Sequence, residues 1–380
     1  MKTILLALAC IVGLCNSIFS QVVSDTLRSV DLQQYVISAS RDYEPEKNVS
    51  QQINIISANR IKNLQVQTTA DALASTPGVF VQKSQMGGGS PVIRGFEASR
   101  ILLVVDGVRM NNLIYRSGHL QNVITADNFA LERIEVLSGP ASSVYGTDAL
   151  GGVVHIITRN PLFSATDKLL INYGIASRYS SANAEKTLHG DLNLGWKNFS
   201  SFTSFTLSDF SDLRGGSSIN PFYGKAFGER NIYVERINNK DSLVTNPDPA
   251  MQIGSAYTQY DVVQKFALRT GQSGLHKVNL QYSNSSDVPR YDRLTDPTAT
   301  GLKFAEWYYG PQKRLLVAYD YSQHLKRGFF KRFKAGINFQ DIEESRITRN
   351  FNNPVRTSRI ENVQVAGAFT EFLRETEKHV

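Results

Sequence analysis

A two-residue alternation of apolar and polar side chains, which recurs from about residue 165 onward, constrains this chain more than any other feature. Because successive side chains of a β-strand point to opposite faces of the sheet, each alternating segment predicts a strand with one apolar face and one polar or small face. The pattern is clearest in residues 188–197, 276–283, 314–322 and 333–340. Their apolar faces are Leu188, Gly190, Leu192, Leu194 and Trp196; His276, Val278, Leu280 and Tyr282; Leu315, Val317, Tyr319 and Tyr321; and Phe333, Ala335, Ile337 and Phe339.

The connections between these segments alternate in length. Residues 271–274 and 326–328 predict short turns, whereas residues 211–255 and 285–310 are long, lack the alternation and are rich in Asn, Asp, Pro and Gly. Short turns at one end of the strands and long loops at the other are typical of a transmembrane β-barrel. A soluble antiparallel sandwich also alternates, but the length of the strands and their uncharged polar faces favour the barrel. The mean hydropathy of −0.24 argues against a helical membrane protein.

The first 20 residues predict a secretory signal peptide. Lys2 is their only charged residue, and an unbroken run of apolar residues and glycine covers residues 4–14. This run is too short to span a bilayer as a helix, and we expect cleavage after Ser20; a buried N-terminal helix is the alternative. Cys10 and Cys15, the two cysteines of the chain, both lie in this segment. The mature chain is therefore expected to have no disulfide, no thiolate nucleophile and no cysteine-based metal site.

Residues 21–45 predict a flexible polar leader that contains one small apolar patch. An extended patch in a mobile leader can add a strand to the edge of a partner's sheet. The alternative is an unstructured linker. The patch consists of Leu32, Gln33, Gln34, Tyr35, Val36, Ile37 and Ser38.

Residues 46–160 predict a compact α+β unit. Ser57 is predicted to cap a helical turn through Leu64, and Thr69 to cap a second helix that Pro77 and Gly78 end. The many glycines at the junctions fit tight turns, and their spacing does not match a phosphate-binding loop. Short apolar runs predict strands at residues 53–56, 79–81, 101–105, 134–137 and 153–157.

No group of residues in the sequence predicts a catalytic or metal site. The 41 Lys and Arg residues only slightly outnumber the 34 Asp and Glu residues, and they form no run of the kind that binds nucleic acid. We therefore expect neither an enzyme nor a nucleic-acid partner, and no permanently bound cofactor. The histidines are scattered without a metal-binding spacing, at His119, His155, His189, His276, His324 and His379.

Three segments of the α+β unit carry a resemblance to a known family: residues 90–96, residues 104–109 and the long run of residues 131–158. Together they closely resemble the plug domain of TonB-dependent outer-membrane receptors. The resemblance implies structural roles for the matching residues, which are Arg94, Gly95, Asp106, Gly107, Arg109, Glu132, Arg133, Glu135, Gly139, Pro140, Tyr145, Gly146, Gly151 and Gly152.

The resemblance also implies an architecture, a location and a partner. The family has a plug inside a 22-stranded barrel in the outer membrane of Gram-negative bacteria, in contact with its lipid. It imports a scarce nutrient with energy from TonB and its inner-membrane motor complex. Residues 32–38 fall where the family has its TonB box, the strand that pairs with TonB.

The expected fold is thus an α+β plug domain followed by antiparallel transmembrane β-barrel strands. We divide the chain into a signal peptide (1–20), a leader (21–45), the plug (46–160) and the first part of the barrel (165–380). Residues 165–380 hold about nine or ten strands of transmembrane length, so the barrel is expected to be incomplete, as in a fragment, a truncated gene or a partial sequence.

Four segments resemble the haem and haemoglobin branch of the family: residues 87–96, 111–122, 286–294 and 305–312. This resemblance implies haem as the transported ligand, with haemoglobin or another haem carrier as a partner. Tyr115, Arg116 and His119 are the candidate substrate-binding residues, with the imidazole of His119 facing the haem iron. The alternatives are a solvent-facing loop histidine, an importer of siderophore or cobalamin, and a structural or adhesive barrel that transports nothing.

Overall fold

The computed structural model describes residues 34–114, 123–216, 218–222, 224, 228–325 and 329–374. From Tyr35 onward the chain forms one compact unit. The predicted signal peptide, the first two residues of the apolar patch in the leader and the predicted turn at 326–328 lie outside the described residues, as do the candidate substrate-binding residues Tyr115, Arg116 and His119.

The first layer of this unit is a five-stranded sheet in the order β3-β8-β9-β6-β7, which we call the plug sheet. All its neighbours are antiparallel except β6 and β9, which run parallel. Each strand follows an apolar run of the sequence, and β6 and β9 are buried along their whole length. The strands are β3 (Gln52–Ser57), β6 (Ile101–Val105), β7 (Val108–Arg109), β8 (Leu131–Ser138) and β9 (Gly152–Thr158).

Two capped helices pack beside the plug sheet. Helix α2 (Ala58–Leu64) begins after Ser57, whose side chain accepts a hydrogen bond from the Arg60 N–H, as predicted. Helix α3 (Thr69–Ala74) is capped by Thr68 and not by Thr69, which corrects the sequence prediction. Thr68 has the extended backbone of a cap and forms a capping box with Asp71, whereas the hydroxyl of Thr69 donates to the Ala126 carbonyl.

The remaining short elements of this part of the chain connect the plug sheet and the helices. Strands β4 and β5 form a hairpin, and the short strands β1 and β2 pair with each other in the leader. None of the helices in the described ranges is long and apolar enough to cross a membrane. These elements are β1 (Tyr35–Val36), β2 (Glu44–Pro45), η1 (Glu46–Asn48), β4 (Val79–Gln82), β5 (Ser90–Ile93), η2 (Ala98–Arg100) and α4 (Ser142–Tyr145).

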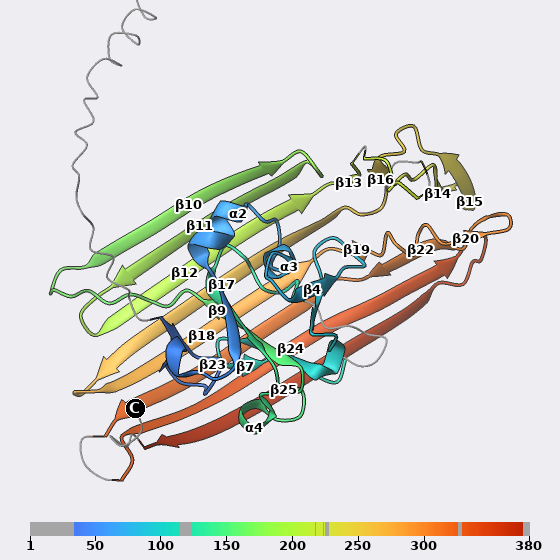
Figure 1. The fold of residues 1–380 in the computed structure, drawn as a ribbon. Helices are drawn as coiled ribbons and strands as arrows, with labels where there is room; N and C mark the ends of the chain where they lie inside the picture. The colour runs from blue at the N-terminus through green and yellow to red at the C-terminus, as the bar shows by residue number, and fades with distance from the viewer. Residues whose placement is uncertain are drawn as a thin grey trace, which may run out of the picture. The chain divides into compact units, whose positions relative to one another are not determined.

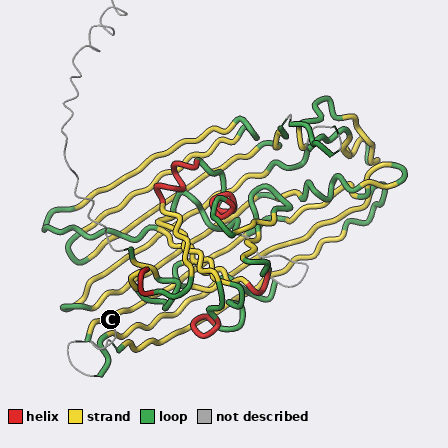
Figure 2. Tube along the Cα trace, viewed as in Figure 1, coloured by secondary structure: helices red, strands yellow, loops and turns green. Residues whose placement is uncertain are grey.

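The second layer is a large antiparallel sheet, which we call the wall, and the plug elements lie against one of its faces (Figure 1, Figure 2). Its strands follow the order β10-β11-β12-β17-β18-β23-β24, with β25 on the far side of β24. These strands are β10 (Leu170–Ser180), β11 (Glu185–Gly195), β12 (Phe199–Phe210), β17 (Tyr257–Thr270), β18 (Gly274–Ser285), β23 (Lys313–His324), β24 (Arg332–Asn350) and β25 (Thr357–Leu373).

The two faces of the wall are inverted relative to a water-soluble sheet. Tyr173 and Ile175 point away from the plug and are 78% and 80% exposed, whereas Ser200 and Thr206 point toward it and are 0% and 1% exposed. The predicted alternation is therefore present, with its apolar side turned outward. Only the end of one segment differs: β11 stops at Gly195, because the Trp196 N–H donates to the Phe199 carbonyl in a turn.

The expected nine or ten strands of transmembrane length become eight, of 11 to 19 residues, within the described part of the chain. The wall also contains β22 (Phe304–Tyr309), which continues the line of β23 along the same edge of β24, and β19 (Val288–Pro289), which pairs with β22. The sheet does not close over the described residues, because β10 and β25 each pair with a single neighbour.

The long loops are more ordered than the sequence indicated. Within residues 211–256, β13 (Leu213–Arg214) pairs with β16 (Met251–Gln252), and β14 (Ile232–Ile237) forms a hairpin with β15 (Lys240–Thr245). Strands β20 (Pro297–Thr298) and β21 (Gly301–Leu302) pair in the next loop. These strands are short and lie outside the apolar alternation, so a period-two pattern could not reveal them.

Candidate functional site

The turn Asp106–Gly107, which joins β6 to β7, anchors the plug to the wall. Both residues have positive φ, 49° and 85°, a conformation that glycine adopts without strain. The turn projects the Asp106 carboxylate out of the plug sheet, where it accepts hydrogen bonds from the N–H (2.9 Å) and hydroxyl (2.6 Å) of Thr158. The same carboxylate accepts from Asn279 (2.9 Å) and Gln281 (2.7 Å) on β18 of the wall.

A buried lysine completes this anchor. The ammonium of Lys265, on β17, lies 3.0 Å from the Asp106 carboxylate and donates to the Thr158 carbonyl at 3.1 Å. Burial alone would raise the pKa of Asp106, but the charge of Lys265 and the hydrogen bonds from Thr158 outweigh it and hold the pKa below its usual range. Asp106 is therefore a carboxylate at neutral pH, and the plug is fixed to the wall by a charge pair removed from water.

Polar contacts elsewhere join the plug to the inner face of the wall. At the β10 edge the guanidinium of Arg178 donates to the carbonyl oxygens of Val66 (2.6 Å) and Gln67 (3.1 Å). On β12 the Thr206 hydroxyl donates to Asp127 at 2.7 Å. On β24 the Gln340 amide donates to the Arg109 carbonyl at 2.9 Å. The polar residues that the alternation placed on one strand face are thus the ones that hold the plug.

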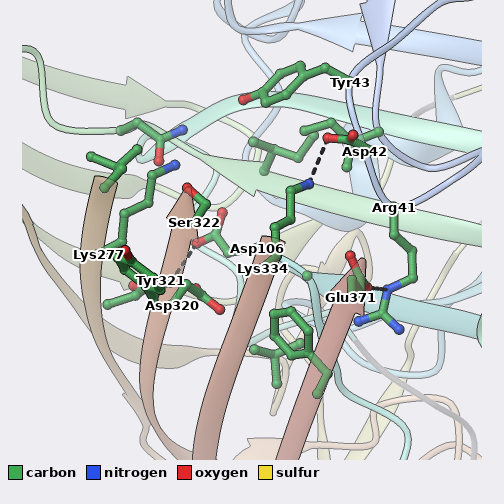
Figure 3. Close-up of a pocket in the computed structure, with 18 of the residues that line it drawn as sticks. Arg41, Asp42, Tyr43, Asp106, Lys277, Asp320, Tyr321, Ser322, Lys334 and Glu371 are labelled. Atoms are coloured by element: carbon green, nitrogen blue, oxygen red, sulfur yellow. Dashed lines mark hydrogen bonds and ion pairs between the residues drawn. The ribbon is translucent and has the colours of Figure 1, made fainter. Parts of the chain in front are cut away.

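A cavity of about 440 Å³ lies between the Asp106–Gly107 turn, the leader and the wall strands β17, β18, β23, β24 and β25 (Figure 3). Its lining is strongly charged, and the charges are largely matched. Lys277 and Asp320 lie directly opposite each other on β18 and β23. A cavity with this lining suits a polar molecule better than an apolar one, because an apolar molecule would take the charged side chains out of water without offering them a hydrogen bond.

The leader closes one side of this cavity with three ion pairs, two of them made by Asp42. Asp42 accepts from the ammonium of Lys334 at 2.6 Å and also contacts Arg332, and the guanidinium of Arg41 lies 3.3 Å from Glu371 (Figure 3). Partial burial raises the pKa of Asp42, but the hydrogen bond and charge of Lys334 outweigh it, so the pKa is lowered. The leader between Tyr35 and Tyr43 is therefore bound to both the plug and the wall.

The described half of the predicted patch in the leader is docked into the plug. Val36 and Ser38 are completely buried, and Val36 packs in the cluster that contains Leu102 and Leu137. The N–H groups of Ile37 and Ser38 donate to the Glu135 carboxylate at 2.9 and 2.8 Å. The sequence did not indicate this docking, because a single buried glutamate on β8 has no local signature of its partner.

The residues of the plug motif hold turns and close backbone contacts. Arg109 donates to the Tyr145 carbonyl at 3.1 Å and pairs with Asp148 at 2.6 Å, which secures α4. A Cβ at Gly152 would lie 2.5 Å from the Leu137 carbonyl, so only glycine fits there. The structure places the other motif residues at turns beside the sheet or on β8: Arg94, Gly95, Glu132, Arg133, Gly139, Pro140, Gly146 and Gly151.

At the end of the wall that carries the long loops, the plug meets the wall through a small apolar cluster. Met86 and Ile124 of the plug pack against Phe210, Tyr257 and Val288. A Cβ at Gly87 would lie 2.5 Å from the Tyr257 hydroxyl oxygen, so the glycine-rich turn approaches the wall closely. The candidate residues Tyr115, Arg116 and His119 belong to the loop that ends just before Ile124, and their positions lie outside the described residues.

Two of the segments that resemble the haem branch meet in space. Strand β19 pairs with β22 through Val288–Tyr309 and Pro289–Tyr308. The Arg290 guanidinium lies 4.6 Å from the centre of the Trp307 ring, and the Arg290 N–H donates to the Trp307 carbonyl at 3.0 Å. These residues form one rigid aromatic and cationic cluster beside the long loops.

The side chains that could bind a metal ion are dispersed over the described residues. No group of three or more His, Cys, Asp or Glu side chains in these ranges is placed to hold a metal ion. His155 is buried and accepts a hydrogen bond from the Gly107 N–H at 3.1 Å. Burial lowers the pKa of His155, so its imidazole is neutral and has a structural role at physiological pH.

Comparison with known protein families supports this geometry. Residues 45–153 match the model of the TonB-dependent Receptor Plug Domain. The chain is 40% identical to the vitamin B12 transporter BtuB of Vibrio vulnificus (strain YJ016) over 126 residues, which are 32% of this chain and 20% of that protein. It is 28% identical to BtuB of Vibrio vulnificus (strain CMCP6) over 289 residues, which are 75% of this chain and 38% of the relative.

Solved structures show the same fold. The copper transporter OprC superposes with a TM-score of 0.62 at 12% identity, over 85% of this chain and 44% of that chain. A mutant of the ferric enterobactin receptor PfeA from Pseudomonas aeruginosa gives 0.62 at 17% identity, over 89% and 48%. The chain therefore spans less than half of the length of these relatives, and at such identities the likeness concerns the fold alone.

Proposed function

We propose, from a chain that carries the plug domain and the fold of TonB-dependent receptors, that the whole protein is an active-transport receptor in the outer membrane of a Gram-negative bacterium. It binds a scarce nutrient at the cell surface and releases it into the periplasm. TonB and its inner-membrane motor complex supply the energy, through residues 32–38 of the leader. The protein acts as a transporter and not as an enzyme.

One observation carries this proposal: a folded plug is fixed by buried polar contacts to the inner face of a sheet whose outer face is apolar and exposed. Tyr173 and Ile175 on that outer face suit lipid, which removes the cost of exposing them to water. The Asp106–Lys265 pair and its neighbours suit a plug that stays in the lumen. A structural or adhesive barrel would have no use for such a plug.

Haem is the nutrient that we propose first. Two of the four segments that resemble the haem branch come together at β19 and β22, where Arg290 and Trp307 make a cationic and aromatic surface beside the long loops. Tyr115, Arg116 and His119 are proposed as the plug residues that contact the ligand, with the His119 imidazole directed at the iron. Haemoglobin or another haem carrier would then deliver the ligand at the surface.

Cobalamin is the second candidate, and the curated relatives favour it. The two V. vulnificus proteins are both named vitamin B12 transporters, and one is 40% identical over 126 residues of this chain. The likeness to the siderophore receptor PfeA concerns the fold and adds no weight to a siderophore.

A binding and growth experiment distinguishes these ligands. The full-length receptor is purified in detergent and titrated with haemin, cyanocobalamin and ferric enterobactin. In parallel, cells that lack the gene are tested for growth with haemin or ferric enterobactin as the sole source of iron, and with cyanocobalamin as the sole source of cobalamin. We expect saturable haemin binding, and His119→Ala to weaken it about tenfold or more. Binding of cyanocobalamin alone would replace haem by the second candidate, and binding of none would contradict the proposal of a nutrient receptor of this kind.

A further inference from the structure

Glu135 holds the leader in an unusual way. Its side chain lies on β8 and is completely buried, and one oxygen, Oε2, accepts hydrogen bonds from the N–H groups of both Ile37 (2.9 Å) and Ser38 (2.8 Å). The other oxygen, Oε1, accepts from Nε of Arg133 at 2.8 Å. Two successive backbone N–H groups that converge on one anion form a nest, in which charge assistance makes each hydrogen bond strong.

This geometry is incompatible with a strand over the same residues. In an extended strand the N–H groups of neighbouring residues point to opposite sides, so they cannot both reach one oxygen atom. Strand β1 accordingly ends at Val36, and a turn begins at Ser38. A partner strand that pairs along the leader beyond Val36 therefore needs at least one of the two hydrogen bonds to Glu135 to break first.

We propose that Glu135 is the catch that keeps the leader docked, and that it sets how readily the leader becomes available for pairing with a TonB strand. The inference rests on the proposed function, since it takes residues 32–38 as the segment that pairs. Glu135 is a positioning residue: it contacts the leader of this chain and neither the nutrient nor TonB.

The environment of Glu135 keeps the catch charged. Burial alone would raise the pKa of Glu135, but the hydrogen bonds from the two leader N–H groups and the charge of Arg133 outweigh it and lower the pKa below the usual range. The leader therefore meets a full negative charge at neutral pH.

The catch is also joined to the wall by a short chain of contacts. Glu135 lies opposite His155 in the β8–β9 pair, and Nε2 of His155 accepts from the Gly107 N–H at 3.1 Å. The adjoining residue, Asp106, is the anchor that holds Lys265, Asn279 and Gln281. A shift of the Asp106–Gly107 turn relative to the wall therefore acts on the strand pair that carries the catch.

The test measures leader mobility and TonB binding separately, in the full-length receptor without nutrient. Within these 380 residues the cysteines, Cys10 and Cys15, lie in the predicted signal peptide, so Tyr35→Cys, at a half-exposed position, provides the site for a spin label once any cysteine elsewhere in the full-length receptor is replaced by serine. The Glu135→Gln change keeps the shape of the side chain and removes its charge. We expect a roughly tenfold rise in the ratio of mobile to docked label, and a similar gain in affinity for the soluble periplasmic domain of TonB.

A matched control and a second variant make the result specific. Glu132→Gln makes the same chemical change three positions away on β8, at a residue that pairs with Arg133 and accepts no hydrogen bond from Ile37 or Ser38, and it should leave the label docked. Ile37→Pro removes one of the two N–H donors without altering Glu135, and it should also mobilise the label even if Glu135→Gln fails to fold.

The outcomes separate the catch from the proposed function. A label that stays as docked in Glu135→Gln and in Ile37→Pro as in the unmodified receptor would overturn the role of Glu135. A label that becomes mobile without any gain in TonB affinity would uphold the catch and overturn the assignment of residues 32–38 to TonB. A gain in both measurements supports the two together.

Discussion

Asp106 is the residue on which the contact between plug and wall most depends. Its carboxylate satisfies the Lys265 ammonium, which is only 5% exposed, and accepts hydrogen bonds from β9 and β18. Removing one partner of a buried charge pair leaves the other charge uncompensated, which costs far more than the pair itself contributes. The sequence pointed to Asp106 and Gly107 as motif residues, but it could not name Lys265, because 159 positions separate the two partners in the chain and only the fold brings them together.

We expect Asp106→Asn to lower the free energy of unfolding of the full-length receptor by about 3–5 kcal/mol, because Lys265 stays buried without a counter-charge. Thermal unfolding in detergent, followed by circular dichroism, measures the loss. Asp167→Asn serves as the control, since Asp167 pairs with Lys197 on the surface and its loss should cost at most about 1 kcal/mol. Equal stabilities of the two variants would show that the buried pair does not anchor the plug.

The lowered pKa of Asp106 predicts the direction of its pH dependence. Because the folded pKa lies below the unfolded value of about 3.9, its stabilising contribution is complete above that pH and is lost as the pH falls through the folded pKa. Between pH 5 and pH 7, the difference in unfolding temperature between the receptor and Asp106→Asn should therefore stay constant. Below about pH 4 the curves of the receptor and of Asp106→Asn should converge, and curves that stay parallel down to about pH 2 would contradict this assignment.

At the level of elements, the long strands could be predicted and the ordered loops could not. A strand of the wall repeats its apolar and polar faces over many residues, so the period appears in the sequence wherever one face is buried. The hairpin of β14 and β15 depends instead on a distant ion pair: Asp241 binds Arg349 of β24 through two contacts, at 2.6 and 2.9 Å. Both side chains are almost fully buried, and 108 positions separate them.

We expect Asp241→Asn to release this hairpin from the tip of β24. The Arg349 side chain lowers the pKa of Asp241, chiefly by its hydrogen bonds, so the aspartate is ionised at neutral pH and the variant loses a charge-assisted contact. Protease added to intact cells should then cut within residues 231–246 several-fold faster than in the unmodified receptor. Asp248→Asn, in a more exposed pair with Arg214, should leave the rate nearly unchanged.

The same experiment tests the orientation of the strands. If the protease cuts the receptor of intact cells within residues 271–274, the short connection between β17 and β18, the long loops would lie in the periplasm. That result would contradict the proposed topology.

For the whole molecule, the two edge strands of the wall, as the described residues form it, determine whether these 380 residues can fold on their own. Strands β10 and β25 each present an unpaired row of backbone groups, and in hydrocarbon each unsatisfied group costs several kcal/mol. Two such edges cost on the order of tens of kcal/mol, against a usual domain stability of about 5–15 kcal/mol. A polypeptide of these 380 residues should therefore not refold in detergent to a compact, heat-modifiable monomer on unheated gels. A sharp band that shifts on heating would show that the sheet closes by itself.

The position of β3 at the edge of the plug sheet has a mechanical consequence. The strand follows the leader directly in the chain and pairs with β8 alone, through residues 52–57. Tension applied to the leader from the N-terminal side reaches β3 before any other strand of the plug sheet, while β9 keeps partners on both sides. A pulling force would thus unfold the plug sheet from its β3 edge inward. The central strands would bear the force only after β3 had separated from β8.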